Sequence, residues 1–163
     1  MAVAIKKLGY KNIKIYKEGI KGWKKKNLPL IRNLPLPSCK AEQIDVKTFK
    51  EILKRAEKEN CQQKRAILIV DFRNIEPIIG PIGIDSFEIK TPCPTLKIRL
   101  DDIINEETRN LIPKDIPVFI FSETGNRDKF FIRYMCKFGY KNIRGIKGGA
   151  REMLKEGLLY EEN

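Results

Sequence analysis

Two short and uninterrupted apolar runs constrain the fold of this 163-residue chain more than any other feature. They are Ala66–Val70 and Val118–Phe121. A strand with one face in water alternates apolar and polar residues, whereas a strand covered on both faces is continuously apolar. Helical patterns lie around both runs, and strands that alternate with helices predict a parallel sheet with helices on both faces. We therefore predict an α/β domain with a central, mostly parallel sheet.

Local patterns place further elements around these strands. Asp45 is a helix-capping residue, and a helix after it is predicted to end in the polar run 57–65. The stretch 74–94 contains many Pro and Gly residues and is predicted to be irregular. The predicted apolar face of the first helix comprises Val46, Phe49, Ile52, Leu53 and Ala56.

The C-terminal half continues the alternation. We predict a short strand at 97–100 with a helical turn opened by Asp101-Asp102, a helix at 127–138, a strand at 142–145 and a final helix at 149–156. Ligands of parallel sheets bind beyond the carboxyl ends of the strands. This places the candidate site at Ser122–Arg127, directly after the second apolar run.

The chain also contains an internal repeat. Lys7–Ile13 matches Lys137–Ile143 at an offset of 130 residues. Self-similarity at a fixed offset indicates a duplicated unit. The second copy lies at the end of the chain, so the first is interpreted as the end of a unit that is otherwise missing. Four further positions recur in the same register, with Lys17, Gly19, Lys25 and Leu28 matching Lys147, Gly149, Lys155 and Leu158.

This repeat sets the predicted domain organisation. Residues 1–30 are the C-terminal remnant of a first repeat, residues 31–43 form a Pro-containing linker, and residues 44–163 form one complete domain. Two explanations remain open: the chain is a fragment of a tandem protein, or it retains the remnant as an attachment. In either case the apolar side chains of residues 1–30 have to be buried against another surface. We expect this segment to pack on the complete domain or to mediate self-association.

Charge and composition exclude several classes of function. The net charge of +12 attracts polyanions, but the lysines occur throughout, mix with acidic residues and lack interleaved aromatic residues, so no nucleic-acid partner is predicted. Histidine is absent, which removes the usual general base and most zinc chemistry. We predict no metal and no cofactor. No apolar run is long enough to span a membrane and the N-terminus lacks a signal-peptide pattern, so a cytoplasmic location is expected.

The four cysteines are too widely spaced for a metal knuckle or a disulfide framework, and we predict reduced, singly placed thiols. Cys136 lies in an apolar run and is predicted to be a small buried core residue. Cys93 lies between Pro92 and Pro94, which predicts a partly exposed position. It is the candidate reactive thiol.

Four segments of the chain resemble the rhodanese-like sulfurtransferases. They are Asp71-Phe72-Arg73, Ile98–Asp101, the strand-loop-helix from Phe119 to Lys129, and Gly139–Ile143 with the following Lys147-Gly148-Gly149. The resemblance covers about residues 44–158 as a complete domain. Within residues 1–30, Tyr16–Trp23 resembles the closing motif of the family.

The resemblance implies a specific chemistry at the loop after Phe121. In this family a thiolate at the first loop position takes a sulfane sulfur from a donor such as thiosulfate, holds it as a persulfide, and passes it to cyanide or a protein thiol. Backbone N–H groups and a helix N-terminus stabilise that anion. Here Ser122 occupies the cysteine position, and a hydroxyl forms no persulfide. The six-residue loop length is retained in Ser122, Glu123, Thr124, Gly125, Asn126 and Arg127.

Other residues depart from the family pattern or match it only structurally. Glu123 and Asp128 place two carboxylates where thiosulfate would bind. The Gly-His-Ile-Pro-Gly-Ala-like stretch of the family is absent, and the Pro-rich residues 78–94 replace it. The family uses the pair equivalent to Asp71 and Arg73 as scaffold.

Two hypotheses follow. The first is a catalytically degenerate rhodanese-like domain that acts as a binding or structural module, with no catalytic residue at Ser122. Its loop then caps the next helix or binds a small anion or a protein partner. The second is a sulfurtransferase that uses another thiol, such as Cys93, or the missing first repeat. Serine-based hydrolysis at Ser122 is a further, weaker alternative, because no histidine activates the hydroxyl.

Overall fold

The computed structural model describes residues 9, 11–12, 14–29, 36–61, 66–73 and 87–161, and the chain divides into two compact units at Pro35. The small unit contains helix α2 (Gly19–Lys25), which has no buried residue. Tyr16 and Trp23 form an edge-on ring pair at 5.2 Å, and the Trp23 indole N–H donates to the Pro29 carbonyl at 3.0 Å. These contacts hold a short helical turn, but they bury little of it.

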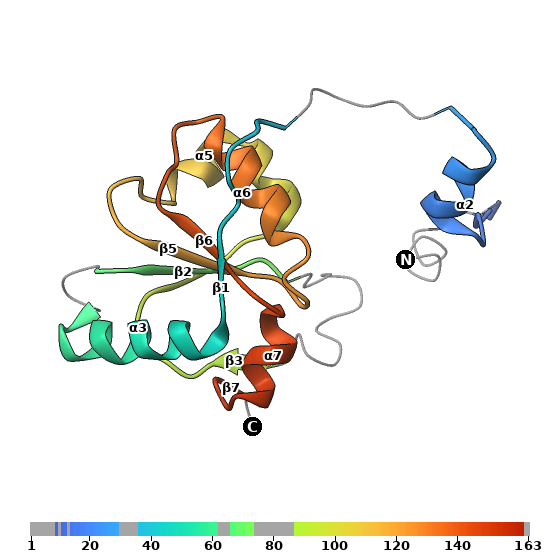
Figure 1. The fold of residues 1–163 in the computed structure, drawn as a ribbon. Coiled ribbons are helices and arrows are strands. Elements are labelled where there is room, and N and C mark those ends of the chain that lie inside the picture. The colour runs from blue at the N-terminus through green and yellow to red at the C-terminus, as the bar shows by residue number, and fades with distance from the viewer. Residues whose placement is uncertain are drawn as a thin grey trace. The chain divides into compact units, whose positions relative to one another are not determined.

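The larger unit is built on a five-stranded sheet with the order β1-β6-β5-β2-β4 (Figure 1). Every neighbouring pair in this sheet is parallel, which confirms the predicted α/β class. A separate antiparallel pair joins β3 (Phe87–Ile89) to β7 (Leu159–Glu161). The strands of the main sheet are β1 (Gln43–Ile44), β2 (Leu68–Asp71), β4 (Thr95–Lys97), β5 (Val118–Phe121) and β6 (Ile143–Ile146).

Helices cover both faces of the sheet (Figure 1). On one face α3 (Val46–Lys58) and α7 (Gly149–Lys155) enclose a core in which the Phe49 and Phe119 rings lie 5.3 Å apart. On the other face, α6 (Asp128–Cys136) encloses a second core, where Phe72 and Phe131 stack at 5.0 Å. The 3-10 helix η2 (Leu100–Ile104) and helix α5 (Glu106–Asn110) extend that second layer. Both apolar runs are therefore buried from two sides.

Most predicted elements form where the patterns place them. The Asp45 carboxylate accepts a hydrogen bond from the Thr48 backbone N–H at 2.8 Å and caps α3. Strand β5 coincides with the predicted run at 118–121. The strand predicted at 97–100 instead ends at Lys97, because Leu100 already begins η2. Part of the predicted irregular region forms β3, and residues 74–86 lie outside the described residues.

Residues 36–43, which the sequence assigned to a linker, lie in the larger unit. Gln43 and Ile44 form β1 beside β6, and the Glu42 carbonyl accepts the Gly145 N–H at 2.9 Å. A two-residue strand carries too little pattern to be recognised in sequence. The linker therefore does not extend to residue 43.

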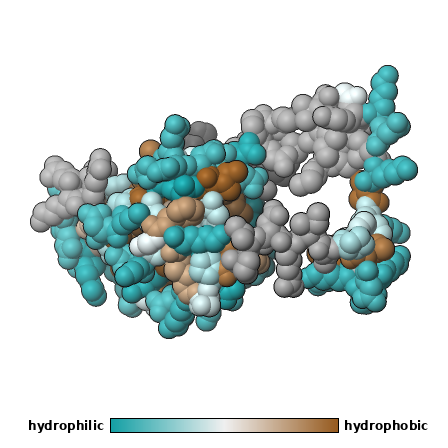
Figure 2. Space-filling model, turned by 90° about the horizontal axis from the view of Figure 1, so that it is seen from above, coloured by the Kyte–Doolittle hydropathy of each residue, from teal (hydrophilic) through white to brown (hydrophobic). Residues whose placement is uncertain are grey.

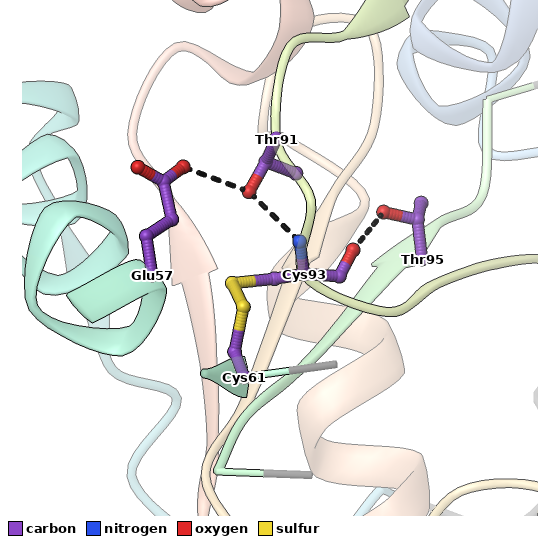
Figure 3. Close-up of a disulfide and its surroundings, with 5 residues drawn as sticks. All are labelled: Glu57, Cys61, Thr91, Cys93 and Thr95. Atoms are coloured by element: carbon purple, nitrogen blue, oxygen red, sulfur yellow. Dashed lines mark hydrogen bonds between the residues drawn. A yellow bond between two sulfur atoms is a disulfide. The ribbon is translucent and has the colours of Figure 1, made fainter. Parts of the chain in front are cut away.

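The cysteines are paired, so the expectation of singly placed thiols is wrong. Cys39 is bonded to Cys136, and Cys61 to Cys93 (Figure 3). Cys93 is 4% exposed rather than partly exposed, and Cys136 is half-buried rather than in the core. The partners are 97 and 32 residues apart in sequence, and the tertiary fold brings them together.

In the part of the chain that the structure describes, no helix combines the length and apolarity that crossing a membrane requires.

Candidate functional site

The loop Ser122–Arg127 lies at the carboxyl end of the central strand β5 and leads into α6. This is the position predicted from the sheet topology. Gly125 has φ +73°, a conformation that glycine adopts without strain. A Cβ there would lie 2.8 Å from the Ile146 carbonyl oxygen, so the loop packs directly on the end of β6.

The Ser122 hydroxyl is buried and fully engaged. Its side chain is 0% exposed, its O–H donates to Asp128 Oδ1 at 2.7 Å, and its Oγ accepts the Gly125 N–H at 3.1 Å. A nucleophile must reach its substrate, and this oxygen has no open side. The hydroxyl instead links the start of the loop to the first turn of α6.

Asp128 is the second buried polar residue of the site. It is fully buried, and the Ile146 N–H donates to its Oδ2 at 3.2 Å. Burial raises the pKa of the Asp128 carboxyl to about 6, although hydrogen bonds from Ser122, Ile146 and Gln43 act in the opposite direction. Burial therefore makes the ionised form of Asp128 less favourable in the native state than in the unfolded chain.

This pKa predicts a pH-dependent stability. The unfolded carboxyl titrates near 3.8 and the native one near 6, so the native state binds more protons between these values. The contribution of Asp128 is fully present below pH 4 and is lost as the pH rises through 6, by about 3 kcal/mol. Asp128→Asn removes this dependence. Urea unfolding of the parent chain and this variant at pH 4 and pH 7 measures it, and a stability difference that does not change with pH would contradict it.

The loop is also fixed from the side of α7. The Ala150 N–H donates to the Ser122 carbonyl at 2.8 Å, and the Arg151 N–H donates to the Glu123 carbonyl at 3.0 Å. Gly149 has φ +57°, and a Cβ on it would lie 2.2 Å from the Ser122 carbonyl oxygen. The Gln43 amide donates to the Gly125 carbonyl at 2.8 Å. The loop carbonyls therefore serve as caps for α7.

Arg127, the cation of the loop, faces a carboxylate of the same loop. It forms an ion pair with Glu123, and its guanidinium lies 5.9 Å from the centre of the Phe72 ring. Both charged side chains are about one quarter exposed. A small anion would have to compete with Glu123 for this cation.

Asp71 and Arg73 form a buried ion pair at the end of the neighbouring strand β2. Two guanidinium nitrogens of Arg73 donate to the two carboxylate oxygens at 2.9 and 2.6 Å, and both side chains are below 5% exposed. Arg73 also donates to the Phe87 carbonyl at 2.6 Å, which ties β2 to β3. The pair has the geometry of a scaffold that supports the strand ends.

Sequence reasoning missed two residues of this site. Gln43 was placed in the linker, and nothing in a two-residue strand indicates that its amide reaches the loop. Asp128 was identified only as a carboxylate that repels anions, whereas the structure joins it to Ser122. Its position directly after Arg127, at the start of a predicted helix, was the available signal. Cys93 lies outside this group, in its disulfide with Cys61.

No family model and no curated protein sequence matches the chain. Solved structures do match. The rhodanese-like domain of an Anabaena protein aligns with 76% of this chain and 81% of its own, at 14% identity and a TM-score of 0.55. The fold is rhodanese-like.

Two further structures have the same arrangement. A protein from Bacillus halodurans aligns with 88% of this chain and 85% of its own, at 16% identity and a TM-score of 0.53. A protein of unknown function from Rhodopseudomonas palustris, titled a possible tyrosine phosphatase, aligns with 72% and 82%, at 15% identity and a TM-score of 0.52. At these identities the rhodanese-like fold is what the proteins share. Function has to be argued from the loop.

Proposed function

We propose that this chain carries a rhodanese-like domain that performs no persulfide chemistry at Ser122 and acts as a structural or binding module. The observation that carries the proposal is the state of the Ser122 hydroxyl. It is buried, it donates to Asp128, and it accepts from Gly125. Sulfur transfer of the rhodanese type needs an exposed thiolate at this position, and the residue here is a buried alcohol.

The contacts of the loop favour a structural role over binding a free anion. The carbonyls of Ser122 and Glu123 cap α7, and the guanidinium of Arg127 pairs with Glu123. Glu123 thus occupies the place that a bound anion would take. The loop holds β5, α6 and α7 together through its carbonyls and through the hydrogen bond of Ser122 to Asp128.

The alternative hypothesis assigns sulfur transfer to Cys93. Its sulfur is bonded to Cys61 and its side chain is 4% exposed. The Cys93 N–H donates to the Thr91 hydroxyl oxygen at 3.2 Å, and the Thr95 hydroxyl donates to the Cys93 carbonyl at 3.3 Å (Figure 3). These bonds fix the backbone on both sides of Cys93. Sulfur transfer here would first require a reductant to open that bond.

Mass spectrometry after thiosulfate treatment tests the proposal. The intact chain is expected to gain no sulfur atom, either as isolated or after reduction of its two disulfides and removal of the reductant. The matched control is Cys93→Ser, treated in the same way. A gain of one sulfur atom in the reduced parent chain that disappears in Cys93→Ser would support the alternative and contradict the proposal.

A further inference from the structure

Helix α2 of the small unit has the same construction as helix α7 of the larger unit, 130 positions later. Gly19–Lys25 and Gly149–Lys155 are both seven residues long. Gly19 has φ +59° and Gly149 φ +57°. Both helices therefore begin at equivalent glycines with nearly the same positive φ, although the preceding Glu18 and Gly148 differ, with φ −80° and +78°.

The ends of the two helices also correspond. The Lys26 and Asn27 N–H groups donate to the Gly22 and Lys24 carbonyls, and the Glu156 and Gly157 N–H groups donate to the Glu152 and Leu154 carbonyls. Asn27 and Gly157 follow with positive φ angles of 51° and 70°. The chain then turns back in the same way, because the Leu28 and Leu158 N–H groups donate to the carbonyls of Trp23 and Met153. The sequence repeat is thus a repeat of local structure.

The two helices differ in what they cover. In α7, Gly149 touches the loop backbone, and Ala150 and Met153 are fully buried against the first core. The equivalent residues of α2 are Gly19, Ile20 and Trp23. A Cβ on Gly19 would meet no atom within 4 Å, and Ile20 is 64% exposed. The covering face of α2 is formed, and within the small unit no described residue packs against Gly19.

The segment before each helix shows the same contrast. Ile146, the last residue of β6, is fully buried, whereas its counterpart Tyr16 is 37% exposed. Gly145 pairs with β1 and β5, whereas its counterpart Ile15 is 72% exposed and lies in no strand. Figure 2 shows hydrophobic side chains at the surface of the small unit among hydrophilic ones. Apolar side chains that gather at a surface are typical of contact sites.

We propose that residues 14–29 are the closing segment of a second rhodanese-like unit. The partner is an α/β unit of the kind formed by residues 36–136, which has a loop after its central strand but lacks its own last strand and helix. In the complex, Ile15 and Tyr16 lie between the first and the central strand of that unit, as β6 lies between β1 and β5. Gly19 then lies against its loop carbonyl, and Ile20 and Trp23 cover its core. This inference concerns a surface outside the Ser122 loop and is independent of the proposed function.

An extended chain tests this proposal, because Trp23 is the sole tryptophan and reports on its own environment. A second copy of residues 36–136 is placed directly before residue 7 of the present chain, which restores the order of elements found in 36–163. Trp23 is half-buried in the parent chain, and we expect acrylamide to reach and quench it there. In the extended chain we expect several-fold weaker quenching and a blue-shifted emission, because Trp23 becomes buried.

Two variants sharpen the result. Gly19→Ala in the extended chain is expected to return the quenching to the parent level, because the equivalent Cβ on Gly149 would lie 2.2 Å from the loop carbonyl. The same change in the parent chain meets no neighbouring atom, so backbone strain at the positive φ is its only cost, and Trp23 is expected to stay open to quenching there. The extended chain is also made with Ile20→Ala, so that the position equivalent to the fully buried Ala150 carries the same small side chain. Two results would overturn the proposal. One is Trp23 quenching equal to that of the parent chain both in the extended chain and in its Ile20→Ala variant. The other is weak quenching in the extended chain that Gly19→Ala does not reverse.

Discussion

Ser122→Cys alone is expected to leave thiosulfate:cyanide sulfurtransfer close to background, whereas the double variant Ser122→Cys/Asp128→Asn is expected to be at least about tenfold more active than the single variant. The reason is the 2.7 Å distance between Ser122 Oγ and Asp128 Oδ1. A thiolate at this position would lie beside the Asp128 carboxylate, and a neighbouring like charge raises the thiol pKa. Each unit of increase lowers the thiolate fraction about tenfold below that pKa.

Asparagine is the matched replacement because it keeps the shape of the aspartate and removes its charge. Its carbonyl still accepts the Ile146 N–H, and its amide donates to a thiolate instead of repelling it. The control is Asp128→Asn with Ser122 retained, which has no nucleophilic sulfur in the loop and is expected to stay inactive. Equal activity of the single and double cysteine variants would show that Asp128 does not govern the loop. If both are inactive, the ion pair of Glu123 with Arg127 becomes the obstacle to test next.

Gly149→Ala is expected to lower the free energy of unfolding by at least about 3 kcal/mol, because it combines backbone strain with overpacking. Its φ of +57° disfavours any side chain, and the new Cβ would lie 2.2 Å from the Ser122 carbonyl oxygen and 2.5 Å from the Gly125 nitrogen. Both contacts are with backbone atoms, which do not rotate away. The loop and α7 would have to separate.

Gly139→Ala is the matched control for this variant. Gly139 has φ +83°, yet a Cβ there would meet no atom within 4 Å. Only the cost of the left-handed backbone conformation remains, and we expect the free energy of unfolding to fall by about 1–2 kcal/mol. Urea unfolding of both variants at one pH separates the two contributions. Equal losses would mean that the contact between Gly149 and the loop adds nothing to stability.

The sequence was sufficient for the fold because its strongest patterns are local. Val118–Phe121 is apolar at every position and forms β5 over the predicted residues. Asp45 stands before an amphipathic stretch and caps α3 as expected. The position of the loop at the end of β5 followed from the topology of parallel sheets. These inferences need no knowledge of distant contacts.

The features that were missed depend on residues far apart in the chain. Cys39 and Cys136 are 97 positions apart, and neither has a neighbouring cysteine that would indicate a bond. Gln43 reaches Gly125 across 82 positions. Strand β7 at the C-terminus pairs with β3 some 70 positions earlier, and three residues carry no recognisable period. The hydrogen bond of Ser122 to Asp128 is local. Its geometry also depends on the distant Ile146 backbone N–H, which donates to the other carboxylate oxygen of Asp128.

The strand order has a consequence for how the chain is made. The central strand β5 and its neighbour β6 come from residues 118–146, whereas β2 and β4, on the other side of β5, are synthesised earlier. A ribosome that has released the chain only as far as Pro117 has exposed β2 with one of its two neighbours, and β1 with none. Unpaired strand edges of this kind favour aggregation. Translational pausing before residue 118 would therefore prolong the most vulnerable interval of biosynthesis, and rapid passage through 118–146 would shorten it.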